Sequence, residues 1–374
     1  MSVSKLKVII SGGGTGGHIF PAIAIADALK MLQPDIEILF VGALGRMEME
    51  KVPVAGYPIK GLWISGLQRS LTLKNLTFPI KLIHSTINAR RIIREFKPDV
   101  VVGVGGYASG PTLRAAAAMR IPTILQEQNS YPGITNKLLA NKANFICVAY
   151  QGMEKFFPKE KIIITGNPVR KEISKTNYSK AEAVKHFNLD PIKPVVLSVG
   201  GSLGALTLNN SIENGLTEFE KAGVQVIWQT GKSFADIALE SVRKQNVKGI
   251  IPMAFINNMD IAYSAADMVI SRAGAIAISE LCVRSMPSIL VPSPNVAEDH
   301  QTRNAMALVS SDAAIMIADA DARTNLVETA IRLAFNKTQQ ENLAANISKL
   351  GFVNAAEEIA RIVINCANTK NVLR

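Results

Sequence analysis

Short apolar segments alternate along the chain with longer segments in which apolar residues recur at helical spacing. In the first half the apolar segments are rich in Val and Ile, and they predict strands at residues 7–10, 36–41, 100–104, 123–126, 145–148 and 162–165. Strands that are apolar along their whole length are typical of parallel sheets covered by helices on both faces. Between them, the spacing predicts helices at residues 21–31, 111–119 and 132–140. The alternation predicts a doubly wound α/β domain.

The same pattern restarts in the second half of the chain. A polar, charged stretch at residues 171–194 precedes predicted strands at residues 195–199, 224–228, 250–252, 268–271, 288–291 and 313–317. Both halves open with the same order of strand, glycine loop and helix, so we expect two Rossmann-like domains facing a cleft that holds the active site. The expected domains are residues 1–166 and 167–349, with a C-terminal helical segment, residues 350–374, that packs back on the first domain.

Composition and charge narrow the class of protein. The chain has 374 residues, of which 48% are hydrophobic and 19% charged, and this ratio excludes intrinsic disorder. The formal net charge of +11 indicates an anionic partner, which is nucleic acid, an acidic membrane surface or a phosphorylated substrate. Three widely spaced cysteines, Cys147, Cys282 and Cys366, fit neither a disulfide framework nor a metal site and suit a reducing, cytoplasmic compartment. No segment has the length and apolarity of a membrane span, so we expect any membrane contact to be peripheral.

Three glycine-rich loops follow predicted strands, at residues 11–18, 103–111 and 200–204. Glycines let backbone N–H groups approach an anion closely, so the loops predict a ligand set with two diphosphates, or one diphosphate and a polar acceptor. The first loop contains the dinucleotide pattern G-x-G-x-x-G at Gly12, Gly14 and Gly17. The second strand, however, ends at residues 40–43 without the carboxylate that a nicotinamide nucleotide's ribose requires. An oxidoreductase is therefore disfavoured, and no P-loop motif is present.

Much of the positive charge lies in one segment. Residues 60–97 contain eight Lys or Arg residues and a single acid, Glu95. Helical spacing predicts that one apolar stripe faces the core, formed by Leu76, Ile80, Ile83 and Ile87. On the other side we expect a docking face for anionic membrane lipids, at Lys74, Phe78, Lys81 and Leu82. The alternatives are a merely solvated basic face and a nucleic-acid surface. The nucleic-acid surface is disfavoured, because the segment has few outward aromatic residues and no known binding module.

Seven motifs occur in an order that resembles the MurG family of bacterial glycosyltransferases, over roughly residues 5 to 366. The motifs are Gly13-Gly14-Thr15-Gly16-Gly17-His18, Gly105-Gly106-Tyr107-x-Ser109-Gly110-Pro111, Glu127-Gln128-Asn129, Gly166-Asn167-Pro168-Val169-Arg170, Gly201-Ser202-x-Gly204-Ala205, Ser271-Arg272-Ala273-Gly274-Ala275 with Ser279-Glu280, and Gln301-x-x-Asn304-Ala305. The resemblance implies the GT-B fold, with an acceptor- and membrane-associated first domain and a donor-binding second domain. Other GT-B transferases, acting on a different lipid or on a natural product, remain the nearest alternative.

The resemblance also implies a reaction. It is the inverting transfer of N-acetylglucosamine from UDP-N-acetylglucosamine to the C4 hydroxyl of the muramoyl sugar in lipid I, which yields lipid II and UDP. The reaction would take place at the cytoplasmic face of the plasma membrane, without a metal or other cofactor. The implied partners are UDP-N-acetylglucosamine, lipid I, anionic lipids and proteins of cell-wall synthesis and division, with no nucleic acid.

Residue roles follow from the matched motifs. The resemblance implies donor contacts at Thr15, Gly16, Gly17, Asn129, Arg170, Ser202, Ile256, Ala275, Ile276, Ala277, Ile278, Ser279, Glu280 and Gln301, and acceptor-side contacts at Gly105, Gly106, Tyr107 and Ser109. Ser202, beside glycines at a predicted helix start, suits a diphosphate, and the carboxylate of Glu280 suits the ribose diol.

An inverting transfer needs a general base, and His18 is the first candidate. The alternative is that His18 only orients its loop. Glu127 is the second candidate base, with loop bracing as its alternative role. Three residues depart from the family pattern, namely Gln126, Leu203 and Ala277. Asp319-Ala320-Asp321 looks like a metal-binding D-x-D motif, but its place before a predicted helix favours helix capping.

Overall fold

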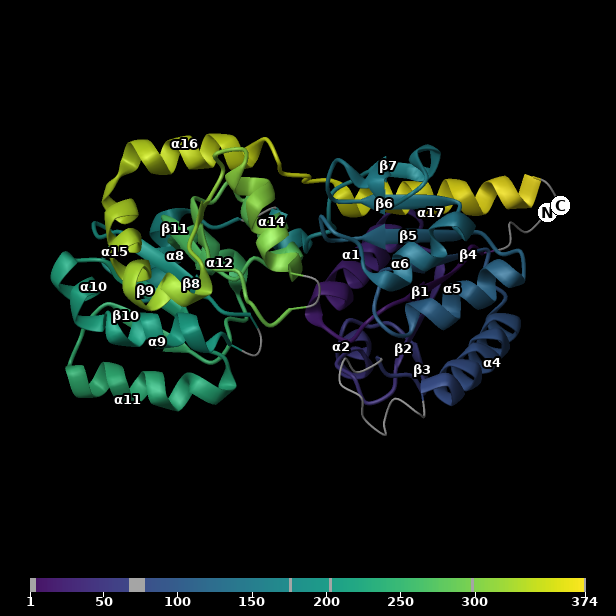
Figure 1. Cartoon of the computed structure of the whole chain (residues 1–374), viewed down its shortest axis with the longest axis horizontal. Coiled ribbons are helices and arrows are strands. Elements are labelled where there is room, and N and C mark those ends of the chain that lie inside the picture. Colours follow the sequence, from purple (N-terminus) through teal and green to yellow (C-terminus); the bar gives the residue numbers. More distant parts are fainter. Residues whose placement is uncertain (1–4, 67–77, 175–176, 202–203, 297–298, 373–374) are drawn as a thin grey trace. The chain divides into compact units, whose positions relative to one another are not determined.

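Figure 1 shows the computed structural model, which describes residues 5–66, 78–174, 177–201, 204–296 and 299–372. The chain divides into two compact units, and each is described by itself. Unit 1 comprises Met1–Arg170 and Asn354–Arg374, and unit 2 comprises Lys171–Val353. The change of unit thus follows Arg170, where the sequence suggested residue 166.

Within the described residues, unit 1 holds one sheet of seven parallel strands in the order β3-β2-β1-β4-β5-β6-β7. The strands are β1 (Lys7–Ser11), β2 (Glu37–Ala43), β3 (Ile59–Leu62), β4 (Val100–Gly103), β5 (Thr123–Glu127), β6 (Phe145–Val148) and β7 (Ile162–Ile164). The sequence predicted every one of these except β3. That strand is only four residues long and has Lys60 and Gly61 at its centre, so it shows no apolar run.

Helices cover both faces of this sheet. The α-helices of unit 1 are α1 (Gly16–Leu32), α2 (Glu48–Val54), α4 (Phe78–Phe96), α5 (Ser109–Ala118), α6 (Ile134–Leu139) and α17 (Ala355–Val372), with short 3-10 turns at Ala140–Lys142, Met153–Lys155 and Lys159–Lys161. One apolar cluster joins α1, α2 and α17 to the sheet, and a second joins α4, α5 and α6 to it. The C-terminal helix α17 packs along α1, so the end of the chain completes the core of unit 1 (Figure 1).

Unit 2 repeats the plan with six parallel strands among the described residues, in the order β10-β9-β8-β11-β12-β13. The strands are β8 (Val195–Val199), β9 (Gln225–Gln229), β10 (Ile250–Met253), β11 (Met268–Ser271), β12 (Ser288–Leu290) and β13 (Ile315–Met316). The helices are α7 (Lys171–Ser174), α8 (Lys180–His186), α9 (Leu206–Asn214), α10 (Leu216–Ala222), α11 (Ala235–Gln245), α12 (Met259–Ala265), α13 (Ala275–Val283), α14 (His300–Val309), α15 (Ala322–Phe335) and α16 (Lys337–Ser348), with 3-10 turns at Lys232–Phe234 and Asp319–Asp321. The expectation of two doubly wound Rossmann-like domains is confirmed.

The order of strands reverses once in each sheet. In unit 1 the chain leaves β1 towards β2 and β3 and returns to β4 on the other side of β1. In unit 2 it does the same around β8, with β9 on one side and β11 on the other. The connections that follow the two central strands therefore lead to opposite sides of the first strand, and ligands of open α/β sheets bind at this point. Three of the predicted motif loops follow β1, β4 and β8, so the fold places them at the two switch points.

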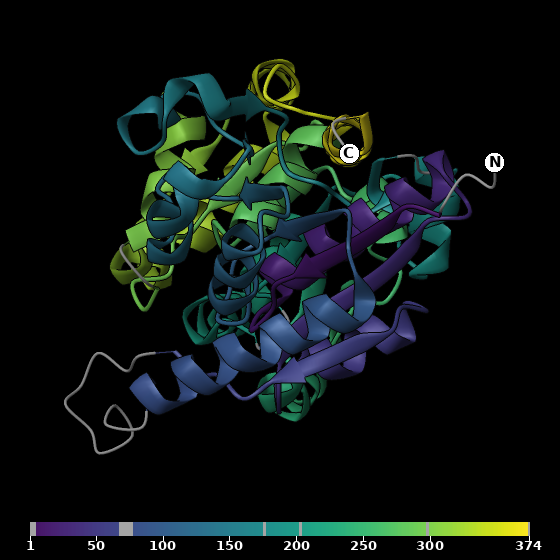
Figure 2. The ribbon, with the colours of Figure 1, turned by 90° about the vertical axis from the view of Figure 1, so that its right-hand side faces the viewer.

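The basic helix α4 is turned the opposite way from the prediction. Its buried residues are Ser85, Ala89, Ile92 and Ile93, and Phe78 and Leu82 pack against the same cluster. Ile80, Ile83 and Ile87 are instead 62%, 63% and 60% exposed. Figure 2 shows α4 on the outer side of unit 1, where it contacts α5 and β3.

The prediction failed because α4 carries two apolar stripes. The stripe that faces the core includes a serine, whose hydroxyl Oγ donates a hydrogen bond of 2.9 Å to the carbonyl oxygen of Trp63. Spacing alone shows that a helix is amphipathic but cannot choose between two such stripes. Lys74 and Leu76, from the same prediction, lie outside the described residues. No helix of the described chain is both long and apolar enough to cross a bilayer.

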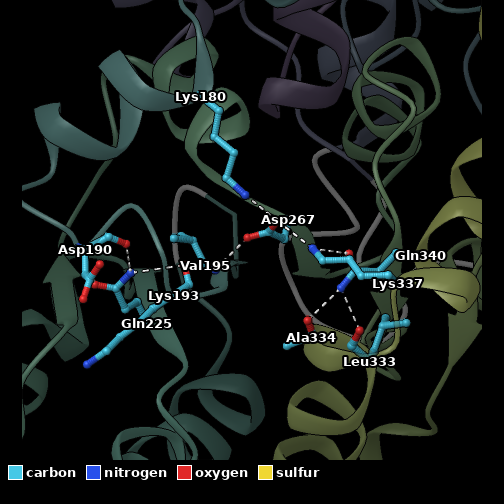
Figure 3. A network of polar contacts seen from close by, with 10 residues as sticks. All are labelled: Lys180, Asp190, Lys193, Val195, Gln225, Asp267, Leu333, Ala334, Lys337 and Gln340. Atoms are coloured by element: carbon cyan, nitrogen blue, oxygen red, sulfur yellow. Dashed lines mark hydrogen bonds and ion pairs between the residues drawn. The ribbon is translucent and has the colours of Figure 1, made fainter.

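Asp267, in the turn between α12 and β11, ties three segments of unit 2 together (Figure 3). Its side chain is 8% exposed and forms ion pairs with Lys180 of α8 and, at 3.3 Å, with Lys337 of α16. Its Oδ2 also accepts a hydrogen bond of 2.9 Å from the backbone N–H of Val195, where β8 begins. Burial alone would raise the pKa of Asp267. The hydrogen bonds from Lys180 and from the backbone N–H of Val195, together with the charges of Lys180 and Lys337, outweigh burial and hold that pKa below its ordinary value.

We expect Asp267→Asn to lower the free energy of unfolding of unit 2 by about 1.5–3 kcal/mol at neutral pH, the range for hydrogen bonds to charged groups. A carboxyl group with a lowered pKa stabilises the fold above its unfolded pKa, about 3.9, and loses this effect as the pH falls towards the folded pKa. The difference between the two proteins should therefore shrink on acidification. Urea unfolding followed by Trp228 fluorescence, in a Trp63→Phe background, measures it. The exposed Asp236→Asn is the matched control, and a difference that is independent of pH would contradict the assignment.

Candidate functional site

The first glycine loop of unit 1 connects β1 to α1 and is held in a backbone conformation that only glycine adopts readily. Gly13 has φ +144° and Gly14 has φ +91°. The loop packs directly on the loop after β4, because a Cβ added to Gly106 would lie 2.2 Å from the carbonyl oxygen of Gly13. The glycines of these two motifs therefore allow the two loops to meet backbone against backbone.

His18 lies where the two loops meet. Its Nδ1 is 3.3 Å from the hydroxyl Oγ1 of Thr15, the residue before α1, and its backbone N–H donates to the carbonyl oxygen of Thr15 at 3.1 Å. A Cβ on Gly105 would lie 2.8 Å from Nε2 of His18, so the ring extends over the β4 loop. When Nδ1–H donates to Thr15, Nε2 carries the lone pair that a general base needs. The geometry thus brings together Thr15, His18 and Gly105, three residues that the sequence assigned to the site.

Tyr107 and Arg46 extend this part of the site. Tyr107 is 46% exposed, and its ring lies against the open side of Gly14. The guanidinium of Arg46, in the loop after β2, lies 5.9 Å from the centre of that ring. Sequence reasoning missed Arg46, although a basic residue just beyond the carboxyl end of a central strand was the signal for it. Ser109 differs from its expected place, because it is fully buried in the first turn of α5, beneath Gly103.

Glu127 braces its own loop in the structure. It is 2% exposed at the end of β5. Its Oε1 accepts hydrogen bonds from the backbone N–H and side-chain amide of Asn129, at 3.0 and 3.2 Å. Its Oε2 accepts from the backbone N–H of Gly133 at 3.1 Å and from the amide of Asn136 at 2.8 Å. Burial raises the pKa of Glu127, and these four hydrogen bonds oppose that effect. Both oxygens are thus engaged, which is the arrangement expected of a bracing residue.

Buried amides continue this bracing around Gln126, one of the departures from the family pattern. The side-chain amide of Gln126 donates to Oδ1 of Asn167 at 2.9 Å, and Asn167 donates to the backbone oxygen of Gln128 at 2.9 Å. Gln128 in turn donates to Gln126 and to the carbonyl oxygen of Val104. The network fixes the end of β5 to the segment that leads to Arg170. The guanidinium of Arg170 lies 5.3 Å from the ring centre of Phe20.

In unit 2 the loop after β8 is anchored from the neighbouring strand. Gly204 has φ +80° and lies so close to β9 that a Cβ would be 2.2 Å from the carbonyl oxygen of Thr230. Gln229, at the end of β9, donates from its amide to the carbonyl oxygen of Gly201 at 3.2 Å and accepts from the backbone N–H of Ile256 at 3.1 Å. One buried side chain therefore links the predicted diphosphate loop to the predicted uracil-binding backbone. Ser202 and Leu203 lie outside the described residues.

Glu280 lies on α13, the helix after the β11 loop, and is 7% exposed. The hydroxyl of Tyr263 on α12 donates a hydrogen bond of 3.0 Å to its Oε2. Sequence reasoning missed both Tyr263 and Gln229, because each contacts its partner only through the tertiary fold. The predicted run Ala275, Ile276, Ala277, Ile278 and Ser279 forms the first turns of the same helix. The hydroxyl of Ser279 donates to the carbonyl oxygen of Ala275 at 2.9 Å.

Polar contacts of Gln301 and Asp319 brace two further loops of unit 2. Oε1 of Gln301, on α14, accepts a hydrogen bond of 2.8 Å from the backbone N–H of Ser293, so this side chain braces the loop after β12. The carboxylate of Asp319 pairs with Arg272 and accepts from the hydroxyl of Thr207 at 3.0 Å. The capping prediction is wrong for Asp319, since its carboxylate bonds across the fold to the β11 loop and not to the helix that follows.

Comparison with known proteins identifies the relatives of this chain. Residues 8–148 match the glycosyltransferase family 28 N-terminal domain, and residues 195–359 match the glycosyltransferase family 28 C-terminal domain. A protein of Phocaeicola vulgatus is 55% identical over 368 residues, which cover 97% of each chain. A protein of Parabacteroides distasonis is 54% identical over 98% of this chain and 100% of its own. Both are named UDP-N-acetylglucosamine–N-acetylmuramyl-(pentapeptide) pyrophosphoryl-undecaprenol N-acetylglucosamine transferase.

Solved structures support the same relationship at the level of the fold. The crystal structure of MurG from Acinetobacter baumannii is similar with a TM-score of 0.76 and 26% identity, over 96% of this chain and 99% of that one. The calicheamicin glycosyltransferase CalG4 is similar with a TM-score of 0.71 and 13% identity, over 98% of this chain and 99% of that one. At the latter identity the similarity concerns the fold alone, which is that of GT-B glycosyltransferases.

Proposed function

The chain belongs to glycosyltransferase family 28, and from this we propose that it transfers N-acetylglucosamine from UDP-N-acetylglucosamine to the C4 hydroxyl of the muramoyl sugar in lipid I, forming lipid II and UDP. Lipid I is undecaprenyl-pyrophosphoryl-N-acetylmuramoyl-pentapeptide. The observation that carries this proposal is the similarity of 51–55% identity, over nearly the whole chain, to transferases named for that reaction. The site geometry supplies groups suited to each step.

His18 acts as the general base in this proposal. Nε2 takes the proton of the C4 hydroxyl as its oxygen forms a bond to the anomeric carbon of the donor sugar. The bond from that carbon to the diphosphate oxygen breaks on the opposite side, UDP leaves with the electron pair, and the configuration inverts. Thr15 orients the imidazole through Nδ1, and the bracing contacts of Glu127 support a positioning role for that carboxylate. Tyr107 and Arg46 offer an aromatic face and a positive charge for the acceptor.

On the donor side, Glu280 accepts hydrogen bonds from the ribose hydroxyls, and Tyr263 holds one of its oxygens in place. The backbone N–H of Ile256 already donates a hydrogen bond to Gln229. Uracil is therefore bound at this position by the carbonyl oxygen of Ile256, or it binds the N–H after the side chain of Gln229 has moved away. The remaining proposed donor contacts are Thr15, Gly16, Gly17, Asn129, Arg170, Ser202, Gln301 and the run from Ala275 to Ser279.

The exposed face of α4 is the proposed membrane contact, in place of the one expected from the sequence. We define this face by Ile80, Ile83, His84, Ile87, Arg90, Arg91 and Arg94, all of which are exposed. The isoleucines lie in the N-terminal half of the helix and the arginines in the C-terminal half. Lys81 has another role, since its ammonium donates to the hydroxyl of Ser65 at 3.1 Å and lies 5.5 Å from the ring centre of Trp63.

Estimated binding free energies indicate that membrane attachment needs both the isoleucines and the arginines of this face. Three arginines near an anionic leaflet contribute about 3 kcal/mol of binding free energy. This is less than the roughly 4 kcal/mol that corresponds to a millimolar Kd. Burying an isoleucine side chain contributes about 1.5–3 kcal/mol when complete, so three partly inserted isoleucines bring the total into the micromolar range. The arginines favour the cytoplasmic leaflet, which carries the anionic lipids, so we propose peripheral attachment there.

We expect the purified protein to move radiolabelled N-acetylglucosamine from UDP-N-acetylglucosamine to lipid I, and not to sterol or diacylglycerol acceptors. Chromatography of the butanol-extracted lipid measures the transfer. His18→Ala should lower kcat by about 10²–10⁴-fold, the usual contribution of a general base, while the exposed His186→Ala should not. Folded wild-type protein without transfer to lipid I would refute the proposed function, and a retained kcat in His18→Ala would refute the assignment of the base.

We expect Glu280→Ala to raise the KM for UDP-N-acetylglucosamine, because it removes the carboxylate that binds the ribose. Tyr263→Phe should raise the same KM by a smaller factor, of about 5–10-fold, since it removes one hydrogen bond that orients Glu280. Initial rates at saturating lipid I separate this effect from kcat. Tyr178→Phe, a half-exposed tyrosine of unit 2, is the control, and an unchanged donor KM in Glu280→Ala would contradict the ribose contact.

We expect replacement of Ile80, Ile83 and Ile87 by Ser to abolish flotation with vesicles that contain anionic lipid, because the remaining charge binds too weakly. Replacement of Arg90, Arg91 and Arg94 by Gln should reduce binding to anionic vesicles and make it insensitive to salt. Ile192→Ser, an exposed isoleucine of unit 2, is the control. Equal flotation of the triple Ile variant and the wild type would contradict this docking face.

A further inference from the structure

A buried carboxylate lies beneath the first glycine loop and has no role in the reaction as described above. Glu48, the first residue of α2, is 1% exposed. Its Oε2 accepts a hydrogen bond of 2.8 Å from the backbone N–H of Gly14, and its Oε1 accepts one of 2.9 Å from the backbone N–H of Ala43. In the part of the chain that the structure describes, no Lys, Arg or His forms an ion pair with it.

The surrounding backbone is shaped to this side chain. A Cβ on Gly13 would lie 2.2 Å from Cδ of Glu48, and a Cβ on Gly42 would lie 2.6 Å from its Cγ. Two glycines, one in the loop and one in β2, therefore leave the space that the carboxylate fills. A glycine loop that presents N–H groups is an anion-binding feature, and here the chain's own carboxylate takes the N–H of Gly14.

Burying this carboxylate without a cation lowers the stability of the fold, so a purely structural role does not explain it. A buried carboxylate without a cation loses several kcal/mol of hydration, and two charge-assisted hydrogen bonds from backbone N–H groups recover only part of it. An apolar residue would fill the same space at lower cost. What the carboxylate provides is direction, because it fixes the N–H vectors of Gly14 and Ala43 and thereby the path of the loop. One residue after Gly14 comes Thr15, whose hydroxyl and carbonyl oxygen both contact His18.

We propose that Glu48 is a positioning residue for the transfer step, which fills the anion-binding place of the first glycine loop and so holds Thr15 and His18 in their working arrangement. The inference rests on the proposed function for its kinetic consequences. It also means that the N–H of Gly14 does not bind a substrate diphosphate, in contrast to what the glycine pattern suggests by itself.

Amide hydrogen exchange tests the proposal without any activity assay. In Glu48→Gln the side-chain amide can accept only one of the two backbone hydrogen bonds, so exchange in peptides that cover residues 12–17 and 42–44 should accelerate at least about tenfold. Glu50→Gln, an exposed carboxylate two residues along α2, should leave these peptides unchanged. Unchanged exchange in Glu48→Gln would overturn the proposal, whatever the outcome of the transfer assay.

Kinetics and rescue then separate positioning from simple stabilisation. In Glu48→Gln and Glu48→Ala, kcat should fall by about 10–100-fold with the KM for UDP-N-acetylglucosamine unchanged, at a temperature where thermal unfolding shows both variants folded.

Added formate, a carboxylate small enough for the vacated space, should restore kcat of Glu48→Ala in a saturable manner, whereas chloride at equal ionic strength should not. A wild-type kcat in folded Glu48→Ala, a change confined to the donor KM, or a rate that formate leaves unaffected would each contradict the positioning role. Transfer by the wild type and by Glu50→Gln shows that such a result concerns Glu48 and not the proposed function.

Discussion

Close approach between loops at the carboxyl edge of each sheet is the constraint on which both sites depend. In unit 1, Gly106 approaches the carbonyl oxygen of Gly13, and Gly12 approaches Val104, so closely that no side chain fits. In unit 2, Gly204 lies equally close to the carbonyl oxygen of Thr230. Adjacent parallel strands bring these loops to the same edge of the sheet. How closely the loops approach then depends on which of their residues lack a side chain. The glycines thus set the distance between loops, and the polar residues around them take their places from that distance.

Much of the fold could be read from the sequence, since long Val- and Ile-rich segments alternating with helical spacing leave few arrangements open. The errors came where the deciding information is tertiary. β3 is short and has a lysine and a glycine at its centre, so only its pairing with β2 reveals it as a strand. The helix α4 has two apolar stripes, and only its packing in the fold, with Ser85 buried and bonded to Trp63, identifies the one that faces the core.

The same limit applies to the sites. His18, Tyr107 and Glu280 lie in recognisable motifs, and their positions followed from the order of strands. Glu48, Gln229 and Tyr263 lie in no motif of this kind, and each acts on a motif residue from a different element. Gln229 and Tyr263 are neutral, so they hold the loop after β8 and Glu280 in place without adding charge to the site. The residues proposed to touch a substrate were therefore easier to anticipate than those that hold them in position.

The pairing of α17 with α1 has a consequence for how the protein is made. Ile359, Ala360 and Val363 of α17 are fully buried in the cluster that also contains Ile25 and Leu29 of α1. Unit 2 is thus an insertion between the last strand of unit 1 and its final helix. During synthesis all of unit 2 leaves the ribosome while unit 1 still lacks its last helix, α17. Domains usually fold in order from the N-terminus, but here the core of unit 2 can be completed before the core of unit 1. The half that carries His18 and α4 is the last to close.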